Sequence, residues 1–205
     1  MFPFPFSFIA PAADIPVEQI ANAEAMSFNG TDTYVAFPAT PNTGDISISF
    51  WVKHSTGGIC VIASGDGVFN YLRFYNEQKV SIVIANQKYY LTTDIKDGNW
   101  HHVVVTNDTS ANEIKGYTDG SLTQTHSLSV NSNNVKTIGA YQNGSLWFFN
   151  GAIDEVGIWN TVLTSTQVAE IYNATAVVNG VPQTANLFTG GLDSSLVYWN
   201  RMGDS

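Results

Sequence analysis

Short apolar stretches separated by turn residues run along most of the chain. In residues 46–52, the side chains of Ile46, Ile48, Phe50 and Val52 alternate with other positions, and this period of two predicts a strand with one buried face. Similar stretches recur at roughly 8–12-residue spacing, with Gly, Asn, Asp or Pro between them. About a dozen short strands at this spacing are typical of an all-β sandwich or jelly roll.

One segment near the C-terminal end has helical signals instead. Thr164 is placed to cap a helix, and Gln167, three residues later, completes a capping box. Leu163 before the cap and Val168 inside the helix form a hydrophobic staple. Val168 and Ile171 then lie on one side of the helix, so we expect a short helix that packs on a sheet.

The strand expected before this helix carries two adjacent acids, Asp154 and Glu155. Successive side chains of a regular strand point to opposite faces, so we expect these two acids on opposite faces of the sheet. Glycoside hydrolysis requires two carboxylates about 5–10 Å apart across one sugar. The sequence contains neither Glu-x-Asp-x-Glu nor Glu-x-Glu. It therefore predicts a protein that is not an enzyme.

Five segments resemble, in order, the motifs of laminin-G-like domains, which belong to the concanavalin A-like lectin/glucanase superfamily. They are MSFNGTDTYV (26–35), ISISFWV (46–52), GNWHHVVVT (98–106), GYTDGS (116–121) and FFNGAIDEVGIWNTVLTSTQVAEIYN (148–173). The resemblance covers roughly residues 24–173 and implies an all-β fold. The expected architecture is a two-sheet antiparallel β-sandwich, a concanavalin A-like jelly roll, with one short C-terminal helix.

The resemblance also implies a calcium site, in which carboxylates and backbone carbonyls hold the ion. Asp154 matches the aspartate that often takes part in this family, and Asp32 is the natural partner from a loop. Asn29 and Gly30 would add carbonyl oxygens. The alternative is that Asp154 accepts hydrogen bonds from backbone amides and Asp32 caps a turn.

Composition limits the partners. The net charge is −9 with only 8 Lys and Arg residues, which argues against a nucleic-acid surface. No apolar run approaches the roughly 18 residues of a membrane-spanning helix, so we expect no membrane insertion.

A glycan site needs aromatic side chains beside amides. Tyr141, Asn143 and Trp147 form the best such stretch, although these aromatic residues could instead fill the core.

Both terminal segments are candidates for docking on a protein partner. The N-terminal one is an apolar arm with phenylalanines at positions Phe2, Phe4, Phe6 and Phe8. Near the other end, the run Leu196, Val197, Tyr198 and Trp199 resembles the strand that usually begins a laminin-G-like domain. This run can close its own sheet, add to a neighbouring subunit through Leu196, Tyr198 and Trp199, or begin a second domain.

These observations predict three regions: an arm (1–23), a laminin-G-like sandwich (24–173) and a tail (174–205). The terminal segments favour a structural or decorating subunit of a larger assembly, such as a virion or surface fibre, and an extracellular or virion-associated location. The alternative is a carbohydrate-binding, lectin-like module, and the third class is a glycan-cleaving enzyme.

Overall fold

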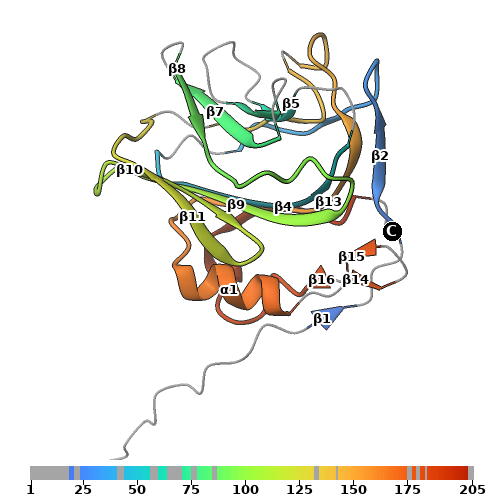
Figure 1. Cartoon of the computed structure of the whole chain (residues 1–205). Helices are drawn as coiled ribbons and strands as arrows, with labels where there is room; N and C mark the ends of the chain where they lie inside the picture. The colour runs from blue at the N-terminus through green and yellow to red at the C-terminus, as the bar shows by residue number, and fades with distance from the viewer. Residues whose placement is uncertain are drawn as a thin grey trace, which may run out of the picture.

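The computed structural model describes most of the chain between residues 19 and 202. The described residues are 19–20, 24–40, 44–55, 60–63, 71–74, 78–84, 87–131, 134–141, 143–174, 177–178, 181–182 and 184–202. Two antiparallel sheets pack face to face, and the elements below them form a further layer (Figure 1). The predicted all-β sandwich with one short helix is therefore confirmed. In the described part of the chain, no helix is long and apolar enough to cross a membrane.

The middle layer in Figure 1 is a seven-stranded sheet. Its first five strands, in spatial order, are β11 (Ser121–His126), β10 (Glu113–Thr118), β9 (Trp100–Asp108), β4 (Ile46–Lys53) and β13 (Asn150–Trp159). Two further strands, β2 (Met26–Asn29) and β17 (Leu196–Asn200), both pair with the edge of β13 that faces away from β4. β2 pairs with the first half of β13 and β17 with the second half, both antiparallel. The C-terminal strand thus closes the sheet of its own chain.

The upper layer in Figure 1 is a six-stranded sheet. Its strands, in spatial order, are β3 (Val35–Ala36), β12 (Thr137–Ile138), β5 (Cys60–Ala63), β6 (Tyr71–Phe74), β7 (Val80–Ile84) and β8 (Gln87–Tyr90). Side chains from both sheets meet between them in an apolar core that includes Phe50, Phe74, Phe149 and Ile153. The alternation in residues 46–52 is the sequence signal of this core, because a strand sends every second side chain to the same face.

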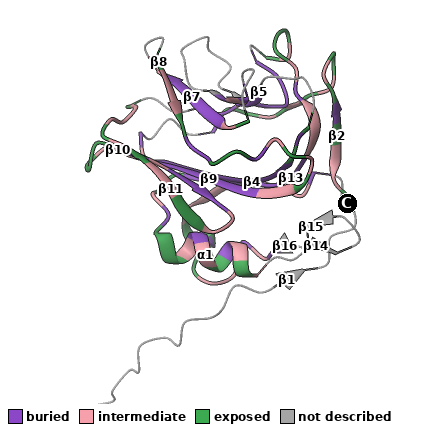
Figure 2. Cartoon of the chain, in the orientation of Figure 1, coloured by how far each residue is buried: buried purple, intermediate pink, exposed green. Residues whose placement is uncertain are grey.

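A second apolar cluster lies on the other face of the seven-stranded sheet. Helix α1 (Ser165–Asn173) begins at Thr164, whose side chain and that of Gln167 form the expected capping box. Val168 and Ile171 are buried against Trp159 in this cluster. Figure 2 shows this burial as one buried side of α1 with exposed residues on the opposite side. The remaining short elements of this layer are β1 (Gln19–Ile20), β14 (Val177–Val178), β15 (Val181–Pro182), β16 (Thr184–Ala185) and a 3-10 turn (Asp193–Ser195).

The motif at Asn29 and Gly30 joins the two sheets. Because it looks like a hairpin turn, one would expect its flanking strands to pair, but β2 pairs with β13 and β3 with β12. The side-chain oxygen of Asn29 accepts hydrogen bonds from the backbone amides of Thr31, Asp32 and Thr33. These hydrogen bonds pair three backbone amides of the turn with one side chain. The turn then leads from β2 in the seven-stranded sheet to β3 in the six-stranded sheet.

Candidate functional site

A β-bulge overturns the expected placement of Asp154 and Glu155. Opposite β4, Asp154 pairs with Trp51 and Gly157 with Ser49, which leaves two residues of β13 facing one of β4. Glu155 has a φ of 51°, the left-handed conformation of a bulge residue. The bulge changes the alternation, so that both acids point towards the helix layer. The prediction of opposite faces was wrong because it assumed a regular strand.

These two acids are buried rather than presented to a sugar. Asp154 is 0% and Glu155 6% exposed. Oδ1 of Asp154 accepts the backbone N–H of Glu155, at 2.9 Å. Oε2 of Glu155 accepts the indole N–H of Trp199 at 2.9 Å, and its Oε1 lies 3.6 Å from Nε of Arg201. The contacts of Glu155 with Trp199 and Arg201 therefore hold the C-terminal tail against the seven-stranded sheet.

The four residues suggested for calcium do not meet. Asn29 pairs with Asn150 across the strands, and Asp154 lies four residues further along β13, about 13 Å away at the rise of a strand. The side-chain oxygen of Asn29 is occupied by three amides, and its Nδ2 donates to Asp32 at 2.7 Å. Asp32 and Gly30 stay at this turn, so one ion cannot use the whole set. Calcium binding itself stays a prediction.

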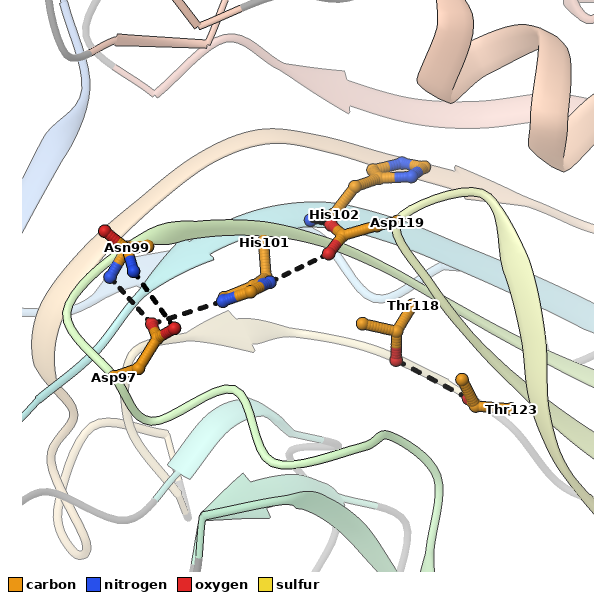
Figure 3. Close-up of polar contacts among 7 residues, drawn as sticks. All are labelled: Asp97, Asn99, His101, His102, Thr118, Asp119 and Thr123. Atoms are coloured by element: carbon orange, nitrogen blue, oxygen red, sulfur yellow. Dashed lines mark hydrogen bonds and ion pairs between the residues drawn. The ribbon is translucent and has the colours of Figure 1, made fainter.

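The adjacent histidines His101 and His102 have different roles (Figure 3). The ring of His101 lies between two carboxylates, with Nδ1 2.9 Å from Asp119 and Nε2 3.2 Å from Asp97. Asp119 also accepts the backbone N–H of His102, at 2.9 Å. Asn99 donates to both oxygens of Asp97, and these hydrogen bonds lower the pKa of Asp97 to about 2. These hydrogen bonds of His101, Asp97 and Asp119 connect the loop before β9 with the turn between β10 and β11.

His102 is buried on the other face of β9, towards α1. Its Nε2 hydrogen-bonds the Ser49 hydroxyl at 2.8 Å, and its ring lies near Trp51 and Tyr172. Burial lowers the pKa of His102 to about 4, although the charge of Asp119 acts in the opposite direction. The pair cannot chelate one metal, since the two rings lie on opposite faces. Among the described residues, no three His, Cys, Asp or Glu side chains are arranged to hold a metal ion.

Two of the residues suggested for glycan binding do come together. The rings of Tyr141 and Trp147 stack with their centroids 4.7 Å apart and their planes at 15°. We call these two rings the aromatic platform. Tyr141 is buried beneath, whereas Trp147 is 36% exposed. Asn143 lies in the turn between them with a φ of 56°, a conformation that Asn tolerates.

The surroundings of the platform include residues that the sequence does not indicate. The guanidinium carbon of Arg73, from β6, lies 5.9 Å from the centre of the Trp147 ring. A side chain at Gly144 would overlap the ring of Tyr34, so this loop packs closely on an exposed tyrosine. Trp147 itself has a φ of 52°. Such a conformation is strained for a large side chain, and strained residues gather at binding sites.

The residues suggested for partner docking fall into two groups. Phe2, Phe4, Phe6 and Phe8 lie outside the described residues. Leu196, Tyr198 and Trp199 belong to β17 and are half-buried. Tyr198 stacks on Phe37 at 4.1 Å, so this strand packs on its own sandwich.

The two packed sheets define a lectin-like β-sandwich. A family model of the concanavalin A-like lectin/glucanases superfamily, of laminin G type, matches residues 29–169. The chain therefore belongs to this superfamily, as its motifs predicted. No curated protein sequence matches the chain.

Solved structures show the same fold. A native heptameric SAP-like pentraxin from Limulus polyphemus is 18% identical, with a TM-score of 0.58 over 86% of this chain and 91% of that one. A putative carbohydrate binding protein from Bacteroides ovatus is 17% identical, with a TM-score of 0.61 over 87% of this chain and 52% of that one. The receptor binding domain of botulinum neurotoxin D is 17% identical, with a TM-score of 0.54 over 78% and 47%. At such identities the likeness concerns the fold alone.

Proposed function

We propose that this protein is a non-catalytic carbohydrate-binding domain that holds a glycan on the aromatic platform. The observation that carries the proposal is the stacking of exposed Trp147 on buried Tyr141. The buried ring fixes the exposed one, so little side-chain entropy is lost when a sugar packs on it. Asn143 lies in the turn between the two rings, and glycan sites combine such amide side chains with aromatic surface.

Two further observations support this proposal. The adjacent acids of β13 are buried and Glu155 is engaged by the tail, which does not suit the cleavage of a sugar. One of the similar structures is described as a putative carbohydrate binding protein. An extracellular location fits this function, because glycans of cell surfaces and matrices lie outside cells.

The experiment is a glycan array followed by calorimetry with the best saccharide. We expect Trp147→Ala to weaken binding at least tenfold, about 1.4 kcal/mol, with the fold intact by circular dichroism. Phe188→Ala is the matched control, because Phe188 is an exposed aromatic residue that contacts Trp199 in the tail. An array without any bound saccharide, or unchanged affinity of Trp147→Ala, would contradict the proposal.

A second candidate is a decorating subunit of a virion or surface fibre. It is favoured by the four phenylalanines Phe2, Phe4, Phe6 and Phe8, which form an apolar arm in the sequence. β17 already pairs within its own chain, so this candidate relies on the N-terminal arm. Deletion of the first twelve residues should then abolish docking on the particle without unfolding the sandwich. A deletion variant that still docks would exclude this route.

A further inference from the structure

A small cavity lies between the seven-stranded sheet and the layer that α1 and the tail form beneath it. Its volume is about 10 Å³, which is close to the space that one water molecule occupies. On the sheet side its lining includes the polar residues Ser49, His102 and Glu155. Ile171 of α1 and Leu187 of the tail close it from the other side. The cavity is therefore buried and has a polar wall.

Strand pairing brings these polar residues to one place. Trp51 of β4 pairs with His102 of β9 on one side and with Asp154 of β13 on the other. The bulge of β13 follows Asp154 and turns the side chain of Glu155 to the same face. Adjacent strands are about 4.8 Å apart, so the backbones of His102 and Glu155 are separated by about 10 Å across β4. Their side chains approach each other above β4 from opposite sides.

One ring nitrogen of His102 faces this region without a protein partner. The residue is only 1% exposed, and its Nε2 hydrogen-bonds the hydroxyl of Ser49 at 2.8 Å. Among the residues that the structure describes, none forms a hydrogen bond with Nδ1 of His102. A buried polar atom without any partner is costly, and ordered water commonly satisfies such atoms.

Glu155 provides the second polar group. Its side chain is buried, and Oε2 accepts the indole N–H of Trp199 at 2.9 Å. A carboxylate can accept several hydrogen bonds at once, so this bond does not exclude another donor. Whatever binds between His102 and Glu155 is thus connected through Glu155 to the C-terminal tail.

We propose that the cavity binds one water molecule, which hydrogen-bonds Nδ1 of His102 and the carboxylate of Glu155. Cavities lined only by apolar atoms stay empty, whereas small cavities with two or more polar partners hold water. The water donates to the carboxylate, and it can donate to or accept from Nδ1, so either tautomer of His102 suits the site.

The bound water completes a chain of polar contacts across the sheet. This chain runs from Ser49 through His102, the water and Glu155 to Trp199. It joins β4 and β9 to β17, which also pairs with β13. The tail is therefore held by a hydrated polar site in addition to the apolar cluster around Trp159.

The first test needs no substitution. A high-resolution crystal structure of the full chain should show density for one water about 2.7–3.2 Å from Nδ1 of His102 and from a carboxylate oxygen of Glu155. In solution, NMR of the labelled protein should give a cross-relaxation signal between the His102 ring hydrogens and a long-lived water. A dry cavity in both measurements would overturn the proposal.

The variant His102→Phe keeps an aromatic ring but removes both nitrogens. We expect the water to be lost and the backbone amides of β17 to exchange their hydrogens about tenfold faster, while those of β7 are unchanged. His101→Phe is the matched control, because the ring of His101 lies on the opposite face of β9 (Figure 3). This control should keep both the water and the slow exchange of β17.

A water that persists in His102→Phe would show that Nδ1 does not hold it. Unchanged exchange of β17 in the same variant would show that the water does not connect the sheet to the tail. Either result would contradict the proposal, and neither concerns the aromatic platform or the glycan-binding function.

Discussion

The indole N–H of Trp199 donates a hydrogen bond of 2.9 Å to the carboxylate of Glu155, a residue 44 positions earlier in the chain. Glu155 is the bulge residue of β13, and Arg201 lies near its other oxygen. The tail therefore does more than extend a sheet, because it supplies a hydrogen-bond donor to a carboxylate that is only 6% exposed. A buried carboxylate without such a partner is costly.

We expect Trp199→Phe to lower the free energy of unfolding by about 1–3 kcal/mol, because the ring stays but the donor to a charged group is lost. Urea denaturation measures this change. In a double-mutant cycle, adding Glu155→Gln should cost less in the Trp199→Phe background than alone. Additive effects of the two substitutions would show that the bond contributes nothing.

Removal of residues 190–205 should leave the second half of the β13 edge unpaired, from Val156 to Trp159. Unpaired edges associate with other strands, so the truncated chain should unfold at lower temperature or form larger species in light scattering. A synthetic peptide of residues 192–202 should restore the behaviour of the full chain. A full-length oligomer that becomes a stable monomer on truncation would instead indicate strand exchange between subunits.

Stability should depend on pH through two buried histidines. Burial lowers the pKa of both His54 and His102 to about 4. Each ring is neutral in the folded protein, whereas the unfolded chain takes up protons below about pH 6.5. The stabilisation is thus complete above pH 6.5 and is lost as the pH falls towards 4, by about 3 kcal/mol for His102.

Urea unfolding at several pH values between 7 and 4 measures this loss. His102→Gln should reduce the slope of stability against pH in this window, even where it lowers stability at pH 7. Asp97 affects stability at lower pH than the histidines do. Its pKa is about 2 in the folded protein, so its contribution to the free energy of unfolding is lost only below about pH 4. An unchanged slope in His102→Gln would mean that this ring is protonated in the folded state.

Gly116 of β10 should tolerate no side chain. A methyl group there would overlap the backbone carbonyl of Leu91, which also accepts a hydrogen bond from Thr123 at 2.9 Å. We expect Gly116→Ala to cost several kcal/mol, the range of severe core clashes. Gly191→Ala is the control: its φ of 72° is unfavourable for Ala, but no atom lies within 4 Å, so we expect about 1 kcal/mol. If Gly116→Ala and Gly191→Ala lowered the free energy of unfolding by similar amounts, the cause at Gly116 would be its backbone conformation rather than the clash with Leu91.

Several features could be predicted because they depend on neighbouring residues. The capping box of Thr164 and Gln167 requires only a spacing of three, and the buried face of β4 requires only alternation. The stacking partners Tyr141 and Trp147 also come from one short segment. In each case, the interacting groups are held close by a few residues of chain, so sequence spacing is a good guide to distance.

The remaining features depend on pairing between segments that are far apart in the sequence. The bulge at Glu155 turns both acids of β13 to one face, and no local signal in the sequence fixes where a bulge falls. The pairing of β4 with β9 decides that His102 meets Ser49, and the pairing of β17 with β13 decides that Trp199 meets Glu155. The sequence by itself determined the sandwich and its helix, and it indicated the short segment that carries Tyr141 and Trp147. Only the tertiary structure decided which distant side chains face one another, because strand register follows from the fit of whole surfaces rather than from the spacing of residues.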